Sequence, residues 1–112
     1  MSRLVLVRVA PEWVCFPFWV RTTDEALADN CSAERLVAEF GAPAELAAAI
    51  DEWDDEFQAV YDRDDPASSG FPDEATTVEW HERGERLAER LAAALSVRVE
   101  FHTARGDRVF GH

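Results

Sequence analysis

The chain has 112 residues, with 23 Asp and Glu against 11 Arg, and a formal net charge of −12. This length predicts a single domain over residues 1–112, and an apolar fraction of 47% is too high for intrinsic disorder. The negative charge argues against direct binding to nucleic acid or to an anionic membrane, because both attract basic proteins. Since no apolar run could span a bilayer and no leader peptide is evident, we expect a cytoplasmic protein.

The first expected elements are two strands. Residues 3–10 carry Val and Leu on both faces, which predicts a central strand. Residues 13–20 are also predicted to be extended, with Pro17 marking an edge, a bulge or a bend. The polar segment 22–32 is predicted to be a loop.

Helices are expected in the middle of the chain. Ser32 is a suitable N-cap for a short helix over 33–40, which Gly41 would end. A longer helix is predicted from 43 to about 63, because its apolar residues recur every three or four positions. The segment 65–72 contains the residues typical of a loop.

The C-terminal part predicts a third helix and a hairpin. Asp73 can cap a helix that continues to about residue 95. Residues 97–102 alternate between apolar and polar side chains, as in a half-exposed strand, and a return strand could follow at 108–110. The order of elements predicts an α+β fold, in which an antiparallel helical hairpin packs on one face of a small antiparallel sheet of three or four strands. We expect the first strand to pair with the strand at 97–102.

No catalytic or metal-binding pattern is apparent. The three histidines, His81, His102 and His112, lack the spacing of a helical metal site. Cys15 and Cys31 are too few for a disulfide scaffold, and neither belongs to a Cys-x-x-Cys motif. The sequence therefore predicts no catalytic residues, no metal and no cofactor.

The negative charge is concentrated in one segment. Residues 24–65 contain fourteen acidic residues and two arginines, whereas acidic and basic residues cancel elsewhere. Asp51 and Asp55 place like charges one helical turn apart, as do Glu52 and Glu56, and this repulsion costs stability. Such a surface either keeps the protein soluble or meets a basic partner. The residues expected to contact a partner are Asp51, Glu52, Asp54, Asp55, Glu56, Tyr61, Asp62, Asp64 and Asp65.

Part of the sequence resembles a group of small acidic bacterial proteins, some of them immunity proteins that neutralise a toxin. The resemblance covers about residues 44–101. Its motifs are Trp53, Tyr61-Asp62, Asp64-Asp65-Pro66-Ala67-Ser68-Ser69-Gly70-Phe71-Pro72 and Trp80-x-x-x-Gly84-x-x-Leu87-Ala88-x-x-Leu91-Ala92. It implies a compact α+β protein and, loosely, toxin neutralisation.

Three functions are compatible with these observations. The first is a non-enzymatic, immunity-type inhibitor whose acidic helix covers the basic surface of a toxin or effector, for example a nuclease. The second is a small-ligand protein or enzyme with a pocket lined by Trp13, Trp19, Trp53 and Trp80. The third is a structural module that oligomerises through residues 13–20.

Overall fold

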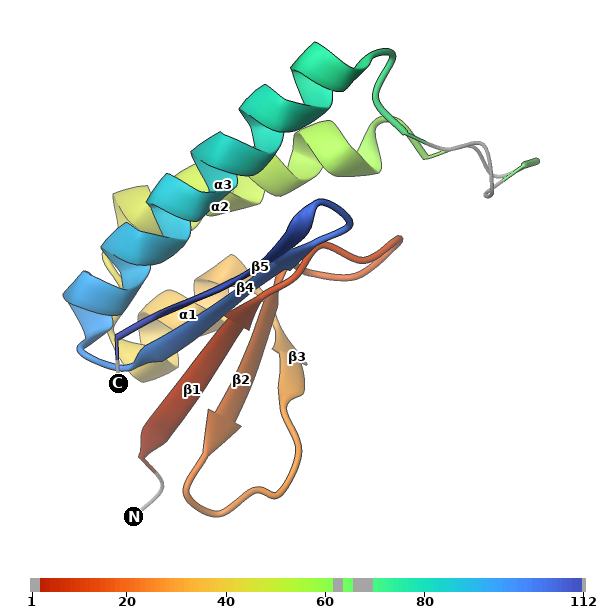
Figure 1. Cartoon of the computed structure of the whole chain (residues 1–112). Helices are drawn as coiled ribbons and strands as arrows, with labels where there is room; N and C mark the ends of the chain where they lie inside the picture. Colours follow the sequence, from red (N-terminus) through yellow and green to blue (C-terminus); the bar gives the residue numbers. More distant parts are fainter. Residues whose placement is uncertain (1–2, 62–63, 66–69, 112) are drawn as a thin grey trace.

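A computed structural model of the chain describes residues 3–61, 64–65 and 70–111. In this part of the chain, three helices cover one face of a five-stranded sheet (Figure 1). The strands are β1 (Leu4–Val9), β2 (Phe18–Thr22), β3 (Asp29–Cys31), β4 (Arg98–Thr103) and β5 (Gly106–Phe110). The helices are α1 (Ala33–Phe40), α2 (Ala44–Gln58) and α3 (Glu74–Leu95). The predicted α+β class is confirmed.

The sheet has the order β3-β2-β1-β4-β5. Strand β1 is central and pairs with β4, as predicted, but the two strands run parallel, with Val7 opposite Val99. Strand β3 pairs with β2 inside a segment predicted to be a loop. The structure thus corrects the expected antiparallel sheet of three or four strands to a mixed sheet of five in the described residues. The parallel pair requires a crossover connection, which the helices supply.

Strand β2 begins at Phe18, five residues later than the predicted start. The backbone N–H of Cys15 bonds to the carbonyl of Glu12 at 3.3 Å, which closes a turn. Pro17 has no N–H to donate to a strand ladder, and it is buried immediately before β2. Residues 12–17 therefore form a loop, called the 12–17 loop below.

The helix ends largely follow the local signals. The side chain of Ser32 caps α1, the side chain of Asp73 caps α3, and Gly41 ends α1 with a φ of 76°. Helix α2 ends at Gln58 and not at about residue 63. The chain directly after Gln58 forms a tighter turn, in which the backbone N–H of Tyr61 bonds to the carbonyl of Gln58, three residues back.

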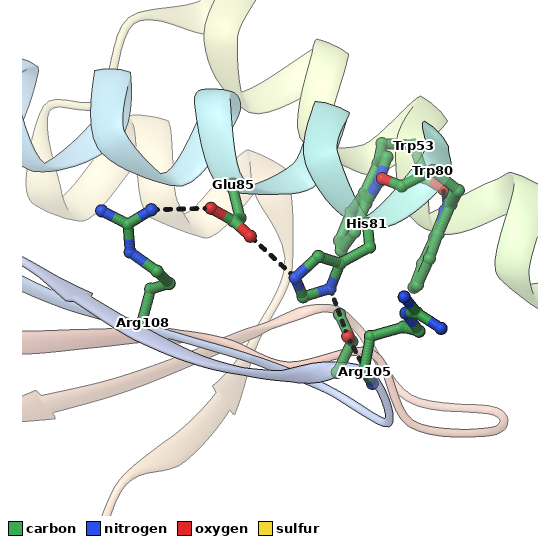
Figure 2. Close-up of polar contacts among 7 residues, drawn as sticks. Trp53, Trp80, His81, Glu85, Arg105 and Arg108 are labelled. Carbon is green, nitrogen blue, oxygen red and sulfur yellow. Dashed lines mark hydrogen bonds and ion pairs between the residues drawn. The ribbon is translucent and has the colours of Figure 1, made fainter. Parts of the chain in front are cut away.

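Helices α2 and α3 form an antiparallel hairpin (Figure 1), and two tryptophans hold it together (Figure 2). The indole rings of Trp53 and Trp80 stack with centroids 4.5 Å apart. Each indole N–H donates to the backbone carbonyl of the other residue, at 2.8 and 3.0 Å. Gly84 makes this close approach possible, because a Cβ at this position would lie 2.3 Å from Cζ2 of Trp53.

Candidate interaction surface

The carboxylates of α2 lie on two different sides of the helix. Asp51, Asp54 and Asp55 line a hollow beside the 12–17 loop. Glu56 lies toward α3, where the Arg83 guanidinium binds both of its carboxylate oxygens at 2.6 and 2.8 Å. This contact holds the pKa of Glu56 below its usual range. The predicted acidic surface is therefore divided, and Glu56 already has a cationic partner.

Asp54 is buried, with only 4% of its surface exposed. Removal from water is the main reason that its pKa rises to about 7, and the negative charges of Asp51 and Asp55 raise it further. The Gln58 side-chain amide offsets part of this effect, but its nitrogen is 3.4 and 3.5 Å from the two Asp54 oxygens, which is long for a hydrogen bond. Asp54 is thus a buried carboxyl whose negative charge is only weakly stabilised by the Gln58 amide.

Asp51 is half-buried and has a raised pKa for the same main reason, with further contributions from Asp55 and from Glu34 on α1. Glu52 and Asp55 are exposed. Helix α2 has no basic residue in its last turn, where the helix dipole is negative and disfavours carboxylates. The folded protein therefore maintains an unfavourable concentration of negative charge at this end of α2.

The remaining predicted contact residues lie beyond α2. Tyr61 is half-buried and packs its ring against Trp13, with centroids 5.0 Å apart. Asp64 and Asp65 are exposed. Asp62 lies outside the described residues.

The 12–17 loop is held by two side-chain amides from other elements. The Gln58 carbonyl oxygen accepts the backbone N–H of Val14 at 3.0 Å, and its NH₂ group donates to the carbonyl of Glu12 at 2.7 Å. Asn30 of β3 accepts the backbone N–H of Phe16 at 3.0 Å and donates to its carbonyl at 2.7 Å. These amides fix the loop against α2 and the sheet edge.

The loop and α2 border an open hollow of about 360 Å³. Val14, Cys15 and Phe16 supply one wall, and the three α2 aspartates supply the other, with Asn30 and Gln58 also contributing. Among the described residues, no basic side chain lines this hollow. Sequence reasoning missed the loop and its two amides, since the apolar run suggested a strand and only Pro17 indicated a break.

A family model described as Serratia CdiI immunity protein-like matches residues 6–104, from within β1 to just after β4. The chain belongs to this family. No curated protein matches the sequence. The family assignment confirms the expectation of an immunity-type bacterial protein, and the matched region includes the 12–17 loop, Asn30 and the whole of α2.

The structure contains part of the tryptophan-lined pocket that was expected for a small-ligand protein or enzyme. Trp13 and Trp80, with Phe57 and Phe71, line a pocket of about 480 Å³. Trp53 lies behind Trp80 and is buried, with 1% of its surface exposed. Trp19 of β2 is on the other face of the sheet, opposite Arg8 of β1. Its indole N–H donates to the backbone carbonyl of Ala10 at 3.0 Å. The structure therefore brings together two of the four predicted tryptophans at this pocket.

Two of the histidines, His81 and His102, join elements of the fold, and Figure 2 shows the contacts of His81. His81 of α3 contacts the Thr103 hydroxyl at 2.6 Å through Nδ1, and Glu85 at 2.8 Å through Nε2. Glu85 in turn binds Arg108 of β5 at 3.0 Å. This chain of contacts ties α3 to β4 and β5. His102 also meets a carboxylate, that of Asp107.

Neither cysteine forms a disulfide. Burial raises the pKa of the Cys31 thiol, which favours an unreactive, protonated group. Within residues 3–61, 64–65 and 70–111, His, Cys, Asp and Glu form no group of three suited to a metal ion. In the same residues, no helix is both long and apolar enough to cross a membrane.

Proposed function

We propose that the protein is an immunity protein that neutralises a toxin by binding to it, without catalysis. The observation that carries this proposal is the family match over residues 6–104. The charge distribution supports it, because the unfavourable carboxylates at the end of α2 lose their mutual repulsion when a basic surface covers them.

The proposed contact is between the α2 carboxylates and a basic surface of the toxin. Among the predicted contact residues on α2, Asp51, Glu52 and Asp55 are the most accessible, because Glu56 is paired with Arg83 and Asp54 is largely buried in the wall of the hollow. A nuclease toxin suits this contact, since a site that holds phosphates must be positive. Covering that site would exclude the substrate.

The experiment is a growth-rescue assay followed by binding measurements. Bacteria expressing individual toxin domains are tested with and without this chain, and we expect it to relieve inhibition by one cognate domain. Association of the purified pair should slow as salt increases. Asp55→Arg should reduce the association rate constant by about threefold to tenfold at low salt. Glu89→Arg, which reverses an exposed acid on α3, is the matched control.

Failure to rescue growth against every toxin domain would contradict the proposed function. Rescue combined with equal association rates for Asp55→Arg and Glu89→Arg would retain the immunity function but remove the α2 acids from the contact.

The aromatic pocket favours a second candidate function, the binding or conversion of a small molecule. Thr103 is one of the residues that line this pocket, and its hydroxyl contacts His81, which in turn contacts Glu85. A hydroxyl, an imidazole and a carboxylate in this order can activate a nucleophile. A ligand that quenches tryptophan fluorescence in the wild type but not in Trp13→Ala would support this function. An unchanged signal across a library of small aromatic and acyl compounds would argue against it.

A further inference from the structure

The 12–17 loop exposes two large apolar side chains. Val14 is 79% exposed and Phe16 is 51% exposed, and both lie at the edge of the hollow beside α2. Exposed apolar side chains clustered next to charged groups are typical of the centre of a protein–protein contact.

The backbone of the loop is held in an unfavourable conformation. Val14 has a φ of 62°, in the left-handed region that a β-branched residue rarely occupies. This conformation costs about 1–2 kcal/mol and persists because the surrounding structure fixes it. The Gln58 amide accepts the backbone N–H of Val14 and donates to the carbonyls of Glu12 before it and Cys15 after it. The loop is therefore pre-organised, and a partner would not have to order it on binding.

The charge of the hollow selects the chemistry of its occupant. Three aspartates line one wall, and the described lining residues include no cation. Asp54 is buried in this wall with only long contacts to Gln58. A carboxylate in this position is stabilised by a donor that brings positive charge.

The apolar wall favours arginine over lysine. A guanidinium is planar and weakly hydrated, and it packs against aromatic rings while it donates to carboxylates. Phe16 and Val14 offer such a wall opposite the aspartates. A lysine ammonium is more strongly hydrated, so it would lose more hydration free energy than a guanidinium on entering this hollow.

We propose that the hollow between the 12–17 loop and α2 receives an arginine side chain of the toxin, with its guanidinium at Asp54 and Asp55 and the adjacent toxin surface on Val14 and Phe16. This inference rests on the proposed function and specifies the site of contact. It adds a buried aspartate and an apolar loop to a surface otherwise defined by exposed acids.

Proton release accompanies this binding. The pKa of Asp54 is about 7, so its carboxyl is largely protonated at pH 6, and a guanidinium that binds the ionised form displaces the proton. The groups that act on the Asp54 carboxyl are Gln58, Asp51 and Asp55 on its own helix, and Cys15 of the loop lines the same hollow. Arginine binding should therefore strengthen as pH rises from 6 to 8.

The first experiment needs no toxin. N-acetyl-arginine N-methylamide is titrated into the ¹⁵N-labelled protein at pH 6 and pH 8, with the citrulline analogue as a neutral probe of similar shape. We expect the largest amide shifts in residues 12–17 and 51–58, with binding at least about threefold tighter at pH 8 and lost in Asp54→Asn. Shifts in other regions, or equal binding of the citrulline probe, would overturn the arginine site.

The second experiment uses the toxin domain identified by growth rescue. Phe16→Ser and Val14→Asn should each weaken binding by about tenfold or more, and Asn tolerates the left-handed backbone of the loop. Leu27→Ser is the matched control, because Leu27 is 80% exposed and does not line the hollow. If only the control weakens binding, the proposed site is wrong while the immunity function stands. If no toxin is neutralised, the proposed function fails, and the arginine titration alone decides on the site.

Discussion

Replacing Asp54 with Asn should stabilise the protein at neutral and alkaline pH. The pKa of this carboxyl rises from 3.8 to about 7 on folding, so between these values the folded protein keeps a proton that the unfolded chain has lost. The contribution of the Asp54 carboxyl to the free energy of unfolding therefore falls as pH rises from about 4 to about 7. Each pKa unit corresponds to about 1.4 kcal/mol, which gives an upper limit of about 4 kcal/mol at pH 8.

The assay is urea denaturation at pH 4.5 and pH 8, followed by tryptophan fluorescence. We expect Asp54→Asn to be more stable than the wild type by about 2–4 kcal/mol at pH 8, and to lie within about 1 kcal/mol of it at pH 4.5. Comparing the two proteins at each pH cancels the titration of all other groups. Asp55→Asn removes an exposed charge from the same helix and should change stability by about 0.5 kcal/mol or less.

Equal or lower stability of Asp54→Asn at pH 8 would refute this reasoning. It would mean that the carboxylate is compensated in the folded protein by more than the long contacts to Gln58. A stabilised variant that no longer binds the toxin would instead show that a buried charge is maintained for binding at a cost in stability.

Other substitutions test the hairpin and the helix ends. Gly84→Ala should destabilise the protein by about 1–3 kcal/mol or more in urea denaturation, because the new methyl group would overlap the Trp53 ring. Ser96→Gly should raise stability by about 0.5–1 kcal/mol in the same assay, since residue 96 ends α3 with a φ of 53°. Glu56→Gln should cost no more than about 1 kcal/mol, because its ion pair with Arg83 is partly exposed, and this cost should shrink in 1 M salt.

Local patterns in the sequence were sufficient for the helices and for one close contact. Ser32, Gly41 and Asp73 act on the backbone within a few residues, so their roles are visible without tertiary information. Gly84 stands on the apolar stripe of α3, where a missing side chain indicates a close neighbour, and Trp53 occupies that position. The concentration of charge in residues 24–65 also belongs to the sequence alone.

The arrangement of the candidate site depends on tertiary contacts between distant residues. Asp54 and Asp55 are consecutive in the sequence, yet Asp54 is buried beside the 12–17 loop and Asp55 is exposed. The bond from Val14 to Gln58 spans 44 residues and sets the loop conformation. Likewise, the parallel pairing of β1 with β4 and the formation of β3 follow from sheet contacts. Short-range preferences therefore determined the helices, while long-range contacts decided the formation of β3, the sheet topology and which carboxylates of α2 are buried.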